Sequence, residues 1–339
     1  MANLSFKDFK SDQEVRWCPG CGDHAVLAAL QRALPKVSQA LAYEKERYVV
    51  VSGIGCSSRL PYYMDTYGFH GIHGRATAIS TGIKVANPTL TVWQACGDGD
   101  ALAIGGNHFI HAIRRNIDIN VILFNNRIYG LTKGQYSPTS KFGAITKTSP
   151  YGTVEHPFNP GSLVLGAKGT FFARSLDVEL KLNEEIMTAA ALHDGCSVME
   201  MLTNCVIFND GAHKEISDPA VRADRTIVLR HGEKMIFGRN RDKGLVLDGL
   251  GLRVVTIGQD GVTEDDILTH DAHCQAMGIH MLLAEMRYPD FPVALGVIRD
   301  VRDVTYDDGV RDQVRDVMLK SKIHSVDELL HSGSTWEVE

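Results

Sequence analysis

The chain has 339 residues, a formal net charge of −6 and 44% hydrophobic residues. This length suffices for one large α/β domain or two smaller ones, and the negative charge argues against general nucleic-acid binding. No apolar stretch is long enough to span a membrane, and residues 1–17 lack the apolar core of a secretory signal. We therefore expect a cytoplasmic protein that binds neither nucleic acid nor membrane.

Hydrophobic periodicity predicts alternating helices and strands up to residue 210. Helices are expected at 25–34, 77–86, 106–116 and 176–192, and Pro35 is expected to end the first of them. Strands are expected at 48–52, 90–95, 119–124, around Phe171 and Phe172, and at 197–202. Such alternation is typical of a doubly wound, mostly parallel α/β sheet.

Residues 129–162 are rich in Gly, Pro, Ser and Thr, which predicts a long loop with one short helix. A loop of this length in a compact domain is usually functional. Past residue 210 we expect short strands at 234–238, 245–247 and 252–257, and helices at 262–275 and 325–331. We divide the chain into an α/β domain at residues 1–210 and a C-terminal elaboration at residues 211–339 that packs on it.

Asp98 and Asn126 follow two successive predicted strands, within the stretches Gly97–Asp100 and Asn125–Ile128. A carboxylate and an amide therefore lie at the carboxyl ends of two strands of a βαβ unit, the edge where parallel sheets bind ligands. These oxygen ligands suit Mg²⁺ that is held partly by a phosphate. The alternative is an ordinary Gly-Asp-Gly turn and an Asx turn that ends a strand.

The seven cysteines are an odd number in a chain expected to be cytosolic, so they do not suggest a disulfide framework. Cys18 and Cys21 form a Cys-x-x-Cys turn whose two sulfurs can reach one metal. Cys56 and Cys205 each follow a predicted strand, so both fall at the sheet edge described above. Cys96 falls at that edge too and competes with them.

Two other cysteines are expected elsewhere. Cys196 precedes its strand and belongs at the opposite edge, and Cys274 is expected in the core. Four thiolates suit zinc as well as an iron–sulfur cluster, so the spacing does not choose the metal. A thioredoxin-like pair and unconnected buried thiols are further alternatives.

Taken together, these motifs resemble those of the β subunit of the 2-oxoacid:ferredoxin oxidoreductases, which are thiamine-diphosphate enzymes. The resemblance covers at least residues 14–210 and includes the segments Cys18–Gly22, Gly53–Ser58, His73–Ala76, Gly97–Asp100, Ile104–His108, Arg114–Asn116, Tyr129–Gln135 and Ser137–Thr139, and Cys205. Within that family, the chain length and the C-terminal elaboration favour members that act on 2-oxoglutarate.

The resemblance implies three cofactors: thiamine diphosphate, Mg²⁺ and one [4Fe–4S] cluster. The Mg²⁺ ligands would be Asp98, Asn126 and the Ile128 carbonyl, and the cluster ligands Cys18, Cys21, Cys56 and Cys205. The residues expected around the cofactor are Gly55, Cys56, Ser57, His73, Gly97, Asp98, Gly99, Asp100, Asn126, Ile128, Gly130, Leu131 and Thr132.

Three residues are expected to act in catalysis: Arg59, His73 and Lys133. The Arg59 guanidinium suits an anionic group, either the substrate carboxylate or a cofactor phosphate, although relatives can carry Lys there. His73 is expected to touch thiamine or a developing oxyanion; an isolated histidine in a turn is as often a capping or surface group. The alternative for Lys133 is a solvated loop charge.

The activity implied is the oxidative decarboxylation of 2-oxoglutarate with coenzyme A to succinyl-CoA and CO₂, with electrons passing through the cluster to ferredoxin. The sequence offers no identifiable glutamate for activating thiamine, so an α subunit is expected to complete the site in an αβ or (αβ)₂ assembly. The alternatives are the same chemistry on pyruvate or branched-chain 2-oxoacids, a non-redox thiamine decarboxylase or lyase with a structural zinc, and a non-catalytic protein of the same fold.

Overall fold

The computed structural model describes residues 4–338, and an eight-stranded sheet forms its centre. In spatial order the strands are β2 (Tyr67–His70), β1 (Tyr48–Ser52), β3 (Thr91–Gly97), β4 (Asn120–Asn125), β6 (Ser197–Leu202), β5 (Phe171–Leu176), β11 (Val293–Asp300) and β7 (Thr226–Leu229). The strands from β2 to β5 are parallel, whereas β11 is antiparallel to β5 and parallel to β7. The predicted mostly parallel α/β sheet is confirmed.

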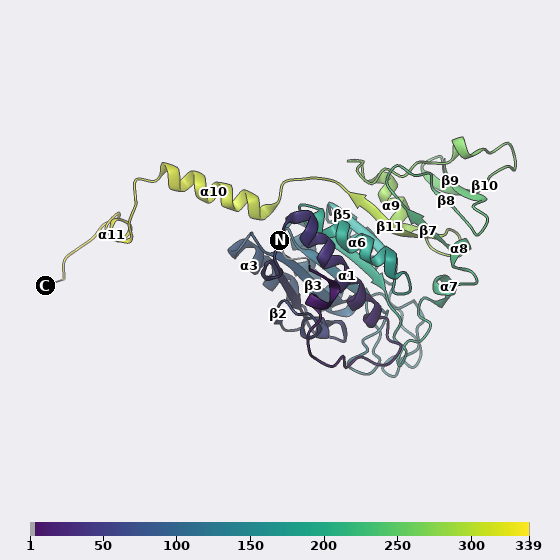
Figure 1. The fold of residues 1–339 in the computed structure, drawn as a ribbon, viewed down its shortest axis with the longest axis horizontal. Coiled ribbons are helices and arrows are strands. Elements are labelled where there is room, and N and C mark those ends of the chain that lie inside the picture. Colours follow the sequence, from purple (N-terminus) through teal and green to yellow (C-terminus); the bar gives the residue numbers. More distant parts are fainter. Residues whose placement is uncertain (1–3, 339) are drawn as a thin grey trace.

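Helices cover both faces of this sheet, as Figure 1 shows. The face covered by two long helices carries α1 (Asp23–Leu41) and α6 (Leu180–Leu192), and the other carries α3 (Ala76–Ala86), α4 (Gly106–Arg114) and α5 (Pro160–Gly166). The arrangement is therefore doubly wound. Among the described residues, no helix is both long and apolar enough to cross a bilayer.

Strand β1 illustrates how the sequence produces the two cores. Tyr48 and Val50 pack into the core beneath α1, whereas Val49 and Val51 pack into the core on the opposite face. Successive side chains of a strand point to opposite faces, so a strand buried on both sides must be apolar at every position. This is why the run 48–52 predicts the strand at its observed bounds.

The prediction that Pro35 ends the first helix is wrong, because α1 continues to Leu41. A proline inside a helix removes a hydrogen bond and crowds the preceding turn, at a cost of about 3 kcal/mol. Leu34 and Val37, on either side of it, are fully buried. Burying each of these side chains contributes about 1.5–3 kcal/mol, so packing against the sheet outweighs the local penalty.

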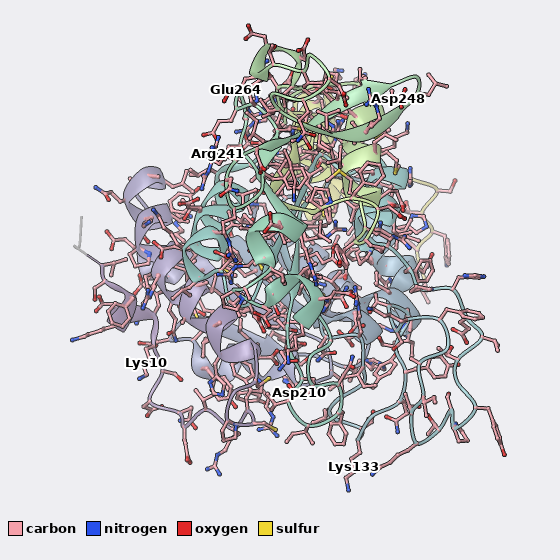
Figure 2. The ribbon with its side chains drawn as sticks, turned by 90° about the vertical axis from the view of Figure 1, so that its right-hand side faces the viewer. Lys10, Lys133, Asp210, Arg241, Asp248 and Glu264 are labelled. Carbon is pink, nitrogen blue, oxygen red and sulfur yellow. The ribbon has the colours of Figure 1, made fainter. Side chains whose placement is uncertain are left out.

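Beyond residue 210 the chain extends the central sheet and builds a second, smaller one. Two short helices, α7 (Lys214–Ser217) and α8 (Arg222–Arg225), lead into β7. The second sheet contains three antiparallel strands, β8 (Ile236–Phe237), β9 (Lys243–Asp248) and β10 (Gly251–Thr256), where the sequence predicts strands. Figure 2 shows this sheet, marked by Asp248, at the opposite end of the molecule from Lys133 and Asp210.

The helix predicted at 262–275 is wrong. The segment forms only a 3₁₀ turn at Glu264–Asp266. The backbone N–H of Leu268 then donates to Leu245 O, and that of His270 donates to Glu233 O, both at 2.9 Å. Because neighbouring segments satisfy these backbone groups, a helix has no advantage there. The nearest helix, α9 (Gly278–Glu285), begins after this segment.

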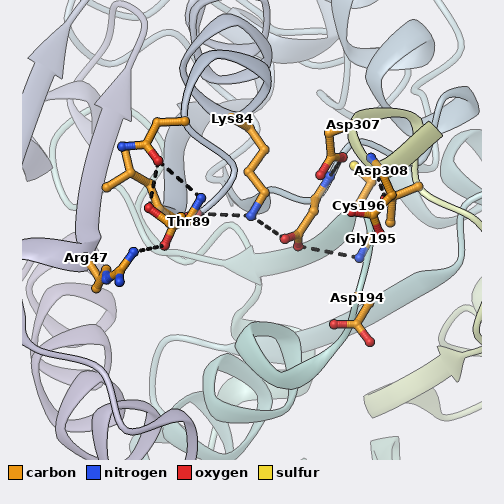
Figure 3. Close-up of polar contacts among 12 residues, drawn as sticks. Arg47, Lys84, Thr89, Asp194, Gly195, Cys196, Asp307 and Asp308 are labelled. Atoms are coloured by element: carbon orange, nitrogen blue, oxygen red, sulfur yellow. Dashed lines mark hydrogen bonds and ion pairs between the residues drawn. The ribbon is translucent and has the colours of Figure 1, made fainter. Parts of the chain in front are cut away.

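The C-terminal tail begins at the amino-terminal edge of the sheet. Asp307, in the first turn of α10 (Tyr306–Lys320), is buried and accepts a hydrogen bond from the backbone N–H of Asp118 at 3.2 Å. The Asp118 carboxylate lies 2.5 Å from the buried Lys84 ammonium (Figure 3). From this anchor α10 and α11 (Val326–Leu330) extend away from the body (Figure 1), and α11 confirms the helix predicted at 325–331.

Candidate functional site

The candidate site lies where the strand order changes direction. From β1 the chain moves to β2 on one side, whereas β3 and β4 continue on the other. Loops at such a switch point leave a crevice at the carboxyl ends of the strands. Here three loops, around Ile54–Ser57, Gly97–Asp100 and Asn126–Thr132, enclose a cavity of about 140 Å³, which we call the cofactor cavity.

The structure brings every residue predicted to bind the cofactor, thirteen positions from Gly55 to Thr132, to the wall of this one cavity. Ile54, Phe124 and Tyr129 also line it, although they are not among the residues expected around the cofactor. The Tyr129 hydroxyl donates to Gly99 O at 3.0 Å, and a Cβ added to Gly99 would lie 2.2 Å from the Tyr129 ring. Only glycine fits at position 99, which explains one glycine of the motif.

Asp98 lines the cavity, and hydrogen bonds orient its carboxylate. It is 2% exposed, and its Oδ2 accepts hydrogen bonds from the hydroxyls of Ser137 and Thr139, each at 2.5 Å. Burial raises the pKa of Asp98 to about 6, and the two hydroxyl donors oppose that shift. A carboxylate this buried is costly unless a cation approaches it. The sequence assigns no role to Ser137 or Thr139, although they lie in the long loop whose length predicts function.

Asn126 and Ile128 face the same cavity as Asp98. The Asn126 Oδ1 accepts a hydrogen bond from the Ile128 N–H at 3.2 Å, so the stretch does form an Asx turn. The turn and the metal ligand are compatible, because an amide oxygen has two lone pairs. Carboxylate, amide and carbonyl oxygens together fit Mg²⁺.

Asp100 connects three segments of the cavity wall. Its Oδ1 lies 2.5 Å from His73 Nδ1 and accepts hydrogen bonds from the N–H groups of Gly74 (2.7 Å) and Ile54 (3.1 Å). It begins a π-helical turn, Asp100–Ile104, a form often found at functional sites. This contact orients the His73 ring, which is 37% exposed, at the cavity.

A second set of residues surrounds a neighbouring cavity of about 190 Å³, the thiol cavity. Cys18, Cys21, Cys56 and Cys205 all line it, and none forms a disulfide. Cys96, the competitor on sequence grounds, is fully buried and lines neither cavity.

The thiol and cofactor cavities share part of their walls, including Cys56, Asn126 and Gly130. A Cβ added to Gly130 would lie 3.4 Å from the Cys56 sulfur and 3.5 Å from the Cys205 sulfur. The absence of a side chain at Gly130 thus keeps open the space between those two thiols.

Burial raises the pKa of two of these thiols, that of Cys56 to about 12 and that of Cys21 as well. The nearby Asp23 carboxylate is the second cause of both shifts. Such thiols keep their protons until a metal displaces them. Within residues 4–338, no three His, Cys, Asp or Glu side chains are arranged to hold a single metal ion.

The remaining predicted residues differ in position. Arg59 lines the thiol cavity and also an open hollow of about 380 Å³ that includes Arg16 and His70. Lys133 lies at an exposed loop tip with a φ of +76°, at the periphery in Figure 2, and lines none of these cavities. The structure thus brings Arg59 and His73, but not Lys133, to the walls of the candidate site.

Comparisons with known proteins agree with this geometry. Residues 53–201 match the family described as the thiamine pyrophosphate enzyme, C-terminal TPP binding domain. The chain is 47% identical over 336 residues to the 2-oxoglutarate oxidoreductase subunit KorB of Mycobacterium tuberculosis, covering 98% of this chain and 88% of the relative. It is also 48% identical over 189 residues to the 2-oxoglutarate synthase subunit KorB of Archaeoglobus fulgidus, covering 56% of this chain and 69% of the relative.

A solved structure is similar over nearly the whole chain. It is a 2-oxoglutarate:ferredoxin oxidoreductase from Magnetococcus marinus with 2-oxoglutarate, coenzyme A and succinyl-CoA bound. The TM-score is 0.76 at 30% identity, covering 99% of this chain and 98% of that one. The chain therefore belongs to the 2-oxoacid:ferredoxin oxidoreductases, as a β subunit of that family.

Proposed function

We propose that this chain binds thiamine diphosphate with Mg²⁺ in the cofactor cavity and a [4Fe–4S] cluster in the thiol cavity. With an α subunit it would decarboxylate 2-oxoglutarate oxidatively, with coenzyme A, to succinyl-CoA and CO₂, and pass electrons to ferredoxin. The observation that carries this proposal is that the two cavities share a wall at Cys56, Asn126 and Gly130. Bound thiamine supplies an electron sink for decarboxylation, and a cluster next to it can take up electrons singly.

The chain's own part in cofactor binding follows from its oxygen ligands. Asp98, Asn126 and the Ile128 carbonyl would hold Mg²⁺, which neutralises the diphosphate. Ser137 and Thr139 keep the Asp98 carboxylate in one orientation through their hydrogen bonds. A preoriented carboxylate loses little freedom when the metal binds, so its contribution to affinity is retained.

The four thiols favour a cluster over zinc. A single zinc ion needs ligands that converge within about 2.3 Å of one point. Cys18, Cys21, Cys56 and Cys205 instead line a cavity of about 190 Å³. A cluster, which is larger than an ion and is held at its corners by cysteine, suits that arrangement.

Two side chains are proposed to act on the substrate. His73, oriented by Asp100, would present its other ring nitrogen to the cofactor or to a developing oxyanion. Arg59 makes no ion pair with any described residue, so its guanidinium is available to a carboxylate or phosphate group. An action of Lys133 near the site stays a prediction, which a Lys133→Gln variant can test in the same assays.

The α subunit is proposed to contribute the groups that this chain lacks, in an αβ or (αβ)₂ assembly. The cofactor cavity of about 140 Å³ is small for a cofactor, which supports a site completed by a partner. Ferredoxin as electron acceptor and a cytoplasmic location belong to the same proposal. The seven unpaired cysteines support a reducing compartment.

The proposal is tested on the αβ complex purified without oxygen. We expect equal amounts of iron and sulfide, bleaching of the visible absorbance by 2-oxoglutarate plus coenzyme A, and lower rates with pyruvate and 2-oxoisovalerate. A colourless zinc protein that still releases CO₂ would favour the non-redox alternative. A complex that fails to bind thiamine diphosphate with Mg²⁺ would refute the enzymatic function.

Cysteine variants test the ligand assignment. Cys18→Ala and Cys205→Ala are expected to lose the cluster, measured as iron per chain. Cys196→Ala is the matched control, since Cys196 is buried away from both cavities and should keep its iron. An intact cluster in either of the first two variants would contradict the assignment.

A further inference from the structure

A further cavity, of about 220 Å³, lies at the carboxyl edge of the sheet beside the cofactor cavity. Its walls include the ends of β4, β5 and β6 and the loop residue Thr139. None of the residues predicted for the cofactor or the cluster lines it. The carboxyl edge of a parallel sheet is the side where ligands bind, so a separate cavity at this edge is a candidate binding site for a second ligand. We call this space the anion cavity.

The stretch 124–128 forms a partition between the two cavities. Phe124, Asn126 and Ile128 line the cofactor cavity. Asn125 and Arg127 line the anion cavity. Successive side chains of this stretch therefore line two different cavities. The proposed Mg²⁺ ligands of the cofactor cavity alternate with the polar side chains of the anion cavity.

Arg127 is the unusual member of the anion cavity. Its guanidinium donates one hydrogen bond, from Nη1 to Ala212 O at 3.1 Å, and forms no ion pair with any described residue. The Arg127 side chain is half-buried, so the cation has lost part of its hydration without gaining a contacting carboxylate. The other cations of the cavity are each paired with a carboxylate: Lys141 with Glu215, Arg174 with Glu200 and Arg287 with Glu285.

The half-buried Arg127 has no contacting carboxylate, and a guanidinium offers parallel donors that match a carboxylate or a phosphate. The hydroxyl of Thr139 and the amide of Asn159 add neutral polar groups to the same wall. We propose that the anion cavity binds a small oxyanion, a carboxylate or phosphate group, on the guanidinium of Arg127. A cavity of about 220 Å³ has room for a compact anion.

The position of Arg127 couples this cavity to the metal site. Its backbone is left-handed, with a φ of +57°, between Asn126 and Ile128. Its carbonyl accepts a hydrogen bond from Ser140 Oγ at 2.7 Å, and that oxygen accepts one from the N–H of Ser137 at 2.8 Å. An anion on Arg127 neutralises a positive charge next to the Mg²⁺ ligands, so it strengthens Mg²⁺ binding, and Mg²⁺ strengthens anion binding equally.

Binding is tested by calorimetry on the αβ complex in chloride buffer, with inorganic phosphate in one titration and succinate in another. We expect one site per chain, and Arg127→Gln weakens it about ten- to a hundredfold. Arg127→Lys keeps the positive charge but loses the parallel N–H donors of the guanidinium, so we expect an intermediate affinity. The titration that saturates identifies whether phosphate or carboxylate is the source. The matched control is Arg253→Gln, which changes an exposed arginine of β10 outside the cavity.

Two outcomes overturn the proposal. In the first, neither anion binds the complex, as when a carboxylate of the α subunit already fills the cavity. In the second, both anions bind the Arg127→Gln variant as tightly as the unmodified chain. Circular dichroism checks that the variant folds, and Arg127→Lys keeps the test valid if Arg127→Gln does not. The coupling rests on the proposed function and is measured separately, as the Mg²⁺ affinity with and without saturating anion. We expect at least about a fivefold increase. Anion binding without that increase would count against the Mg²⁺ site, not against the anion cavity.

Discussion

Glu200 and Arg174 form an ion pair in the interior, and its removal gives the sharpest test of the packing beneath the site. The Arg174 Nε lies 2.6 Å from Glu200 Oε2, with the two side chains 7% and 3% exposed. The other carboxylate oxygen accepts a hydrogen bond from the Asn125 amide at 2.7 Å. In Glu200→Leu the guanidinium stays buried with only neutral acceptors, Asn159 Oδ1 at 3.2 Å and Ala284 O at 3.3 Å.

Removing one partner of a buried ion pair lowers the free energy of unfolding by about 3–5 kcal/mol. This is a large part of the total for a typical domain, which is about 5–15 kcal/mol. Arg174→Met should cost a similar amount, because it leaves a buried carboxylate. The double variant removes both charges, and we expect it to lose only about 1 kcal/mol, roughly the hydrogen bond to Asn125.

The free energy of unfolding is measured by urea denaturation followed by circular dichroism, with the slope checked for constancy. The matched control is the exposed pair of Arg302 and Asp194, where Arg302→Gln should change stability by less than about 1 kcal/mol. If the two buried single variants add up in the double variant, the pair is not energetically coupled and the reasoning fails.

Three further predictions concern the site. Asp98→Ala should abolish Mg²⁺-dependent thiamine diphosphate binding, and unchanged calorimetric affinity would contradict the metal site. Gly130→Ala should fold normally, because Gly130 does not have a positive φ, but hold less iron, since the new methyl group fills space between two thiols; full iron content would argue against a cluster there. His213 is buried, and burial, with the charge of Arg127 as second cause, lowers its pKa to about 3. In the unfolded chain this histidine binds a proton below about pH 6.5, whereas in the folded chain it stays neutral down to about pH 3. The stability that the neutral histidine allows is therefore fully present above about pH 6.5. It is lost as the pH falls towards 3, by up to about 1.4 kcal/mol per pH unit. His213→Gln should therefore flatten the acid side of the stability profile, and an unchanged slope would show that His213 does not contribute.

The sequence predicts the elements whose pattern is set by burial on both faces, such as β1 and β6. It does not predict β2, because all four residues of that edge strand are exposed and carry no apolar run. It does not predict β11 either, where Gly296 and Arg299 interrupt the apolar pattern and the register shifts between Val297 and Arg299. In both strands, pairing with a neighbour decides the structure, and neighbours are not visible in a single sequence.

The residues of the candidate site likewise fall into those that the sequence predicts and those that only the fold reveals. Asp98 and Asn126 are recognisable because short motifs at strand ends carry them. The hydroxyl donors Ser137 and Thr139 reach Asp98 from about forty residues away, so only the folded loop reveals their role. Arg127 lies within a recognised motif, yet its side chain points into a different cavity, which depends on the backbone conformation at that one residue.

The place of Cys56 in the walls of two cavities has a consequence for how the enzyme would fail. In the proposed holoenzyme, any oxidant that attacks this sulfur disturbs the inorganic centre and the vitamin's pocket together. Damage would then silence a subunit outright, instead of leaving a half-working catalyst that releases CO₂ without delivering its electrons.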